Sequence, residues 1–189
     1  MQICGLSVTP QGNLLAVCSE PNALVELKAD SGHCLREIVL PSDMEGQWHS
    51  VQLTTGELVV SHGVPADWPG YTRGLNRVCV VGDDGKVTRG YGGYRGSDVG
   101  RLEAPCHLAV DEDSGMIYVA DASNNRVVLL SLTLEFVRYV VEELSHPYRL
   151  HFHQATRRLF ISHNRDDMHV TANGSMDISV IGCLGGSVG

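Results

Sequence analysis

Several features that mark other protein classes are missing from this sequence. No apolar run reaches the roughly 18 residues that a membrane-spanning helix requires. The first residues, MQICGLSVTPQGN, contain neither a basic segment nor a long apolar stretch of the kind found in secretory signals. Aromatic residues make up only 6% of the 189 residues. We therefore expect no membrane association and no secretory signal.

The six cysteines form no CxxC pair and show no spacing typical of a zinc site. Several of them lie inside apolar runs such as LLAVC and RVCVV, where a free thiol behaves as a small hydrophobic side chain. This pattern predicts buried, reduced cysteines. Because disulfides are rare in reducing compartments, the sequence favours a cytoplasmic protein.

Charge is distributed unevenly along the chain, which has a formal net charge of −8. Residues 71–101 are the exception, with six basic and three acidic side chains. An acidic protein is a poor general binder of nucleic acid, since neutralisation of phosphate supplies most non-specific affinity. RNA binding to the arginine-containing segment 71–101 is therefore kept as an alternative function that the net charge disfavours.

Internal repeats are the strongest pattern in the sequence. Residues 103–139 align without a gap on residues 145–181, so that Pro105 meets Pro147 and Leu108 meets Leu150. The first half of the chain repeats the same layout, with Leu6 and Val51 as the corresponding positions. One insertion, HGVPADWPGYTRG at 62–74, accounts for the longer spacing between the second and third units.

Each unit contains four short runs of strand-forming residues separated by Gly, Asn and Asp turns, and no segment keeps a helical period. The fourth unit contains Asn173–Gly174, a hairpin signal. Four antiparallel strands per 40 to 45 residues or so is the period of a β-propeller blade. The sequence thus predicts a single all-β domain over 1–189, with about four four-stranded antiparallel blades at roughly 3–40, 48–92, 103–141 and 145–182. In the third blade the expected strands are 106–110, 116–121, 126–131 and 134–141.

The segment from Tyr91 to Leu130 resembles an NHL repeat, with a Gly-rich lead, a proline before the first strand and a D-x-x-N-x-R turn. That turn is formed by Asp121, Asn124, Asn125 and Arg126, to which we assign a structural role. The second unit keeps Asn76 and Arg77 of this pattern, and the first keeps only Asn22.

NHL domains are typically six-bladed, so the resemblance implies a partial ring that could self-associate through its open blade edges. The chain is similar to part of the NHL domain at the C-terminus of tripartite-motif proteins. This similarity implies a non-enzymatic scaffold that recognises a protein or peptide partner or substrate. Ubiquitin-ligase activity would need a RING domain, which this sequence does not contain.

The insertion at 62–74 is the predicted partner-binding segment. It contains Trp68, Tyr71 and Arg73, the residue types most enriched at binding hot spots. Blade packing does not need such an insertion, and loops on a rigid scaffold are where binding residues concentrate. No nucleophile elbow and no phosphate-binding glycine motif is present, so the sequence predicts neither catalytic residues nor a cofactor.

A metal-dependent propeller lyase or hydrolase is the third functional class considered. His151 and His153 lie two residues apart on a predicted strand and share one face. A ring of ligand-type residues is also expected at the ends of the second strands, and comprises Cys18, His62, Asp121 and His163. Equivalent positions on neighbouring blades are too far apart for direct coordination at about 2 Å, so no metal site is predicted.

Overall fold

The computed structural model describes residues 2–65, 74–163 and 177–182, and the hairpin expected at Asn173–Gly174 lies outside them. The described residues form strands joined by tight turns, without a helix long and apolar enough to cross a membrane. The strands are β1 (Gln2–Val8), β2 (Leu14–Glu20), β3 (Ala23–Leu27), β4 (Cys34–Val39), β5 (Gln47–Gln52), β6 (Leu58–His62), β7 (Leu75–Val81), β8 (Val87–Tyr94), β9 (Pro105–Asp111), β10 (Met116–Asp121), β11 (Arg126–Ser131), β12 (Phe136–Val141), β13 (Pro147–His153), β14 (Arg158–His163) and β15 (Asp177–Gly182). Two single helical turns are η1 (Ala122–Asn124) and η2 (Gln154–Thr156).

The strands form four antiparallel sheets in which each strand pairs with the next along the chain. The sheets are β1–β4, β5–β8, β9–β12 and, within the described residues, β13–β15; we call them blades 1 to 4. The first strands of successive blades pack against one another, so that β1 contacts β5, β5 contacts β9 and β9 contacts β13. Blades arranged around their first strands are the defining feature of a β-propeller, and the prediction of an all-β propeller fold is confirmed.

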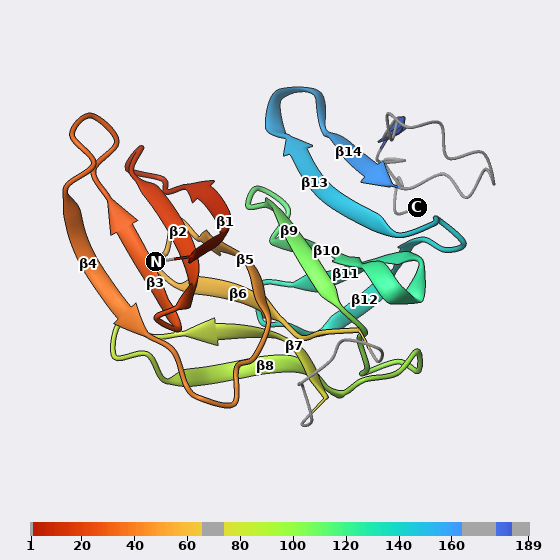
Figure 1. The fold of residues 1–189 in the computed structure, drawn as a ribbon. Coiled ribbons are helices and arrows are strands. Elements are labelled where there is room, and N and C mark those ends of the chain that lie inside the picture. Colours follow the sequence, from red (N-terminus) through yellow and green to blue (C-terminus); the bar gives the residue numbers. More distant parts are fainter. Residues whose placement is uncertain (1, 66–73, 164–176, 183–189) are drawn as a thin grey trace, which may run out of the picture.

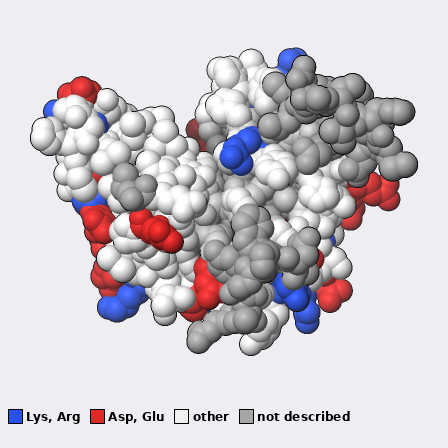
Figure 2. Space-filling view, viewed as in Figure 1, with Lys and Arg blue, Asp and Glu red and all other residues white. Residues whose placement is uncertain are grey.

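The four blades form an open arc. Figure 1 shows blade 1 at one end of the arc and blade 4 at the other, with blades 2 and 3 between them. The space-filling view is hollowed between these two ends (Figure 2). Among the residues that the structure describes, blades 1 and 4 therefore each have one face that no neighbouring blade covers.

The register of β5 differs from the repeat alignment by one residue. Strand pairing places Leu108 opposite Val119 and Ser50 opposite Val60. Because Val60 and Val119 both lie two residues before the end of their strands, Ser50 corresponds to Leu108, and the assignment of Val51 was wrong. A one-residue slip moves every side chain to the other sheet face, and Val51 packs toward blade 3.

The hydrophobic core consists of three apolar layers, one between each pair of neighbouring blades. Because a blade is covered on both faces, its middle strands are apolar at nearly every position, as in VVLL at 127–130. The layer between blades 2 and 3 includes Val59, Val80, Leu108, Val119 and Leu130, all at most 1% exposed. Burying a side chain of this size contributes about 1.5–3 kcal/mol, so these layers hold the arc together.

Gly5 allows β1 to lie against β5. A Cβ atom at this position would be 2.2 Å from the backbone oxygen of Trp48 and 3.2 Å from the Cα of His49. Gly5→Ala is therefore expected to lower the free energy of unfolding by about 1–3 kcal/mol, because the backbone of blade 2 would have to move.

The control for this prediction is Gly93→Ala in β8, where an added Cβ would meet no atom within 4 Å. Its effect on the free energy of unfolding is expected to stay within about 0.5 kcal/mol. Urea unfolding of the two variants measures both values. Equal effects at positions 5 and 93 would contradict the close approach of β1 and β5.

Candidate functional site

One face of the arc collects most of the polar groups that sequence analysis singled out. In a four-stranded meander, the connection between the second and third strands lies at the same end as the linkers between blades. The linkers are residues 40–46, 95–104 and 142–146, and the second-to-third connections include 63–74 and 122–125. We call this side of the molecule the linker face. It carries the NHL-like turn and the described start of the insertion, 63–65.

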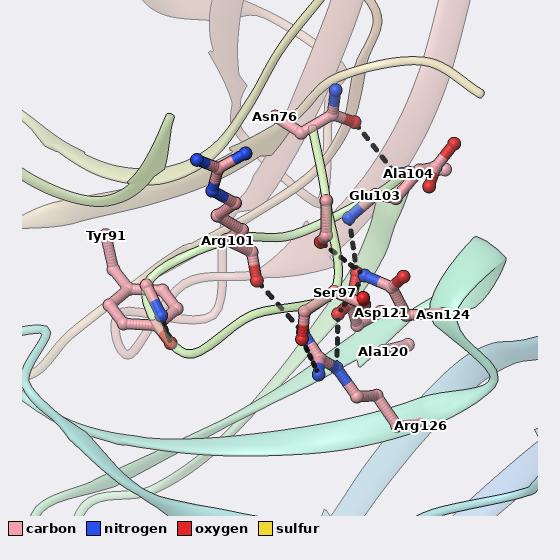
Figure 3. Close-up of polar contacts among 12 residues, drawn as sticks. Asn76, Tyr91, Ser97, Arg101, Glu103, Ala104, Ala120, Asp121, Asn124 and Arg126 are labelled. Carbon is pink, nitrogen blue, oxygen red and sulfur yellow. Dashed lines mark hydrogen bonds and ion pairs between the residues drawn. The ribbon is translucent and has the colours of Figure 1, made fainter. Parts of the chain in front are cut away.

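The NHL-like turn of blade 3 binds the linker that precedes that blade (Figure 3). Asp121 accepts hydrogen bonds from the backbone N–H of Glu103 at 2.6 Å, from Asn124 Nδ2 at 2.9 Å and from Arg126 Nε at 2.7 Å. Asn124 also donates to the carbonyl oxygen of Gly96 at 2.9 Å. The carboxylate thus joins the turn to the linker.

Arg126 extends this network further into the same linker. Its guanidinium donates to the carbonyl oxygens of Ser97 at 2.6 Å and Arg101 at 2.9 Å, and it lies 4.5 Å from the centre of the Tyr139 ring. Burial raises the pKa of Asp121 to about 6, against the lowering effect of its hydrogen bonds. The carboxylate is therefore ionised at neutral pH and forms a buried ion pair with Arg126. We call Asp121, Asn124 and Arg126 the blade 3 clasp.

An asparagine at one equivalent turn position ties each of the first three blades to the linker that follows it. In blade 3 this residue is Asn125, whose φ of 53° lies in the left-handed region that asparagine tolerates better than most residues. The three contacts are Asn22 Nδ2 to the Pro41 oxygen at 3.1 Å, the Ala104 N–H to Asn76 Oδ1 at 2.7 Å, and the His146 N–H to Asn125 Oδ1 at 3.0 Å. The asparagines that the repeats share are thus linker-binding residues.

Blade 2 replaces the clasp carboxylate with a histidine and takes a carboxylate from elsewhere. His62 occupies the Asp121 position, and its Nε2 accepts a hydrogen bond from Arg77 Nε at 3.1 Å. Arg77 also forms an ion pair with Asp43 of the preceding linker, at 2.9 Å. Burial, together with the Arg77 charge, lowers the pKa of His62 to about 4, so the ring is neutral and can accept.

A pocket of about 350 Å³ lies between blades 1 and 2 on the linker face, beside the start of the insertion. The indole of Trp48 lines it, and Trp48 Nε1 donates to the carbonyl oxygen of Gly63 at 2.5 Å. Val64, the third residue of the insertion, lines the same pocket. The lining residues are Gln2, Cys4, Ser19, Glu20, Asn22, Ser42, Met44, Glu45, Gly46, Gln47, Trp48 and Val64.

The predicted hot-spot residues Trp68, Tyr71 and Arg73 lie outside the residues that the structure describes. The described start of the insertion, 63–65, lies next to this pocket, and Val64 lines it. We call the pocket and residues 63–65 the insertion site.

A stacked pair of histidines joins the first strands of blades 2 and 3 and was not identified from the sequence. The rings of His49 and His107 are 3.7 Å apart and nearly parallel. Each Nδ1 accepts a backbone N–H from the next blade, that of Leu108 for His49 and of Leu150 for His107, both at 3.3 Å. Burial lowers the pKa of His49 to about 4 and that of His107 to about 2. Once Ser50 is aligned on Leu108, His49 and His107 occupy the same position of the repeat. The sequence alignment was wrong by one residue in β5, so it did not show this equivalence.

The residues that were considered as metal ligands do not come together in one site of the described structure. His62 and Asp121 are bound to Arg77 and Arg126, and His151 and His153 lie on an exposed face with their ring centres 6.3 Å apart. Within residues 2–65 and 74–163, no group of three or more His, Cys, Asp or Glu side chains is arranged to hold a metal ion.

No family model and no curated protein matches the chain, but solved structures share its fold. Hydrazine synthase from Kuenenia stuttgartiensis aligns over 95% of this chain and 46% of its own length, with a TM-score of 0.64 and 14% sequence identity. A streptogramin B lyase aligns over 93% of this chain and 53% of its own length, with a TM-score of 0.57 and 13% sequence identity. The β-propeller domain of Cps50 (Swd1) from Myceliophteria thermophila aligns over 95% of this chain and 54% of its own length, with a TM-score of 0.58 and 14% sequence identity. The chain is similar to these propellers in fold, and it spans about half their length.

Proposed function

We propose that this chain is a non-enzymatic protein-interaction scaffold, which holds a protein or peptide partner at the insertion site. In this proposal the chain is an NHL-type propeller that serves as a recognition module like that of tripartite-motif proteins. The observation that carries the proposal is the pocket beside the described start of the insertion. It combines an indole, a methionine and a valine with the carboxylates of Glu20 and Glu45.

Two features of the linker face support this proposal. The clasp and the asparagine contacts tie the linkers to the blades, so the surface around the insertion is preorganised and loses little conformational entropy on binding. Mixed apolar and polar lining is also typical of pockets that accept a side chain of a binding partner. A basic or apolar side chain would suit the two carboxylates and the indole.

Photo-crosslinking from the insertion site tests the proposal. A photoreactive amino acid replaces Glu45, which lines the pocket, and in a matched variant it replaces the exposed Asp30 in the β3–β4 turn at the opposite end of blade 1. We expect a discrete crosslinked partner from position 45 in cell lysate and none from position 30. Equal crosslinking from both positions would contradict a partner site on the linker face.

The same assay with Trp68→Ala and Arg73→Ala introduced together tests the insertion itself. Loss of hot-spot side chains costs about 2 kcal/mol or more each, so the crosslink at position 45 should fall at least about thirtyfold. The melting temperature should stay the same, because blade packing does not need these residues. A large drop in melting temperature would show that the segment is structural instead.

The two alternative functions have direct discriminators. In the segment 71–101, four basic residues are already paired with carboxylates: Arg77, Lys86, Arg89 and Arg101. RNA retention is therefore expected to be weak and to disappear as salt is raised to physiological levels. A metal-dependent lyase or hydrolase would retain stoichiometric metal on purification, which elemental analysis measures.

A further inference from the structure

Blade 1 exposes a sheet face whose equivalent in the neighbouring blades is buried. We call the side of blade 1 that points away from blade 2 the blade 1 outer face. Leu6 is 54% exposed there, Val8 66% and Val39 67%, next to the small side chains of Ala16 and Val25. An exposed row of large apolar side chains of this kind marks an interaction surface.

The repeat shows what normally covers this face. In blade 3 the positions equivalent to Leu6, Ala16 and Val25 are occupied by Leu108, Val119 and Val128. These three side chains are at most 1% exposed, because they pack against blade 2. The blade 1 outer face therefore has the composition of a face that packs on a preceding blade.

Blade 4 exposes the opposite kind of face. Among the residues that the structure describes, its outer face, which points away from blade 3, carries His151, His153 and Arg158, all exposed, around the half-buried Phe160. In blade 3 the positions of His151 and Phe160 are occupied by Ala109 and Tyr118, which are buried against blade 4. Blade 4 thus replaces an apolar packing face with a largely basic one.

The two outer faces are complementary in charge. Glu37 is an exposed acidic side chain of the blade 1 outer face, where strand pairing places it opposite Val25. The blade 4 outer face presents the guanidinium group of Arg158. Opposite charges at the rim of an apolar patch favour one partner and fix its orientation.

We propose that two copies of this chain close into a single ring, with the blade 1 outer face of each copy packed on the blade 4 outer face of the other. Four blades per copy match about half of a β-propeller, since the chain covers 54% of the Cps50 propeller domain. Two identical interfaces related by a two-fold axis leave neither end of the arc uncovered. This inference does not depend on the proposed function.

Sedimentation velocity of the purified chain at micromolar concentrations tests the ring. We expect the mass of two chains. Val8→Asp combined with Val39→Asp should convert the dimer into a folded monomer, because two carboxylates would be buried in each apolar interface. The matched control is Val99→Asp, a residue 63% exposed in the linker 95–104, which should remain a dimer.

Charge reversal provides the second arm of the experiment. Arg158→Glu should weaken the dimer at least about tenfold, and adding Glu37→Arg should restore it. Circular dichroism melting confirms that each variant is folded. The proposal would be overturned if the wild-type chain were a monomer at every concentration, or if the Val99→Asp control dissociated. Assemblies larger than two chains that these substitutions leave unchanged would also overturn it.

Discussion

Replacing Asp121 with alanine is expected to lower the free energy of unfolding by about 3–5 kcal/mol, the usual effect of breaking a buried ion pair. The guanidinium of Arg126, with its side chain 7% exposed, would remain in a buried site without its carboxylate. The backbone N–H of Glu103 would also lose its acceptor. The loss should release the linker 95–104 from blade 3 as well as destabilise the fold.

The comparison for this prediction is Asp84→Ala, which removes an exposed ion pair with Lys86. Exposed pairs contribute little, so this change should leave the free energy of unfolding almost unchanged. Chemical unfolding gives both free energies, and hydrogen exchange of residues 95–104 shows whether the linker is released. A loss below about 1 kcal/mol for Asp121→Ala would contradict the role of the clasp.

Acidification from pH 7 to pH 4 is expected to destabilise the protein strongly, because two buried histidines and the half-buried His107 are held neutral. Burial lowers the pKa of His49 and His62 to about 4 and that of His107 to about 2, from an ordinary value of 6.5. The unfolded chain takes up these protons below pH 6.5 while the folded chain does not. Stability is thus fully present above pH 6.5 and falls with pH, by up to about 1.4 kcal/mol per pH unit for each such histidine.

Urea midpoints measured across this pH range test the prediction. His107→Phe keeps an aromatic ring against His49 but removes one titrating group, so the loss of stability on acidification should become smaller. His33→Gln, in an exposed turn, is the control and should leave the pH profile unchanged. If the profiles of wild type and His107→Phe coincide below pH 6.5, the stacked histidine pair does not control acid stability.

The two predictions concern different parts of one scaffold. The clasp acts on the linker face and holds the loop before blade 3, whereas the histidine pair acts at the first strands and joins blades 2 and 3. Both keep neighbouring blades in fixed positions. The insertion site between blades 1 and 2 depends on that rigidity, since its walls come from two blades and a linker.

The blade architecture was determined by the sequence itself. Short strands with tight turns repeat along the chain, with one longer spacing at the insertion, and the expected third-blade strands 116–121 and 126–131 coincide with β10 and β11. Asp121 and Arg126 are five residues apart in one turn, so their contact is also local enough to be anticipated. Patterns of this kind are visible because short continuous apolar runs and turn chemistry depend on neighbours in the chain.

Contacts between blades were decided only by the tertiary structure. Arg77 and Asp43 are 34 residues apart, and His49 contacts the Leu108 N–H across 59 residues. The one-residue shift at Ser50 shows why such pairs were missed: the apolar pattern of β5 allows two alignments, and strand pairing selects one. The exposed faces of blades 1 and 4 likewise follow from the position of each blade in the arc. An apolar position such as Leu6 is the same in sequence whether or not a neighbouring blade covers it.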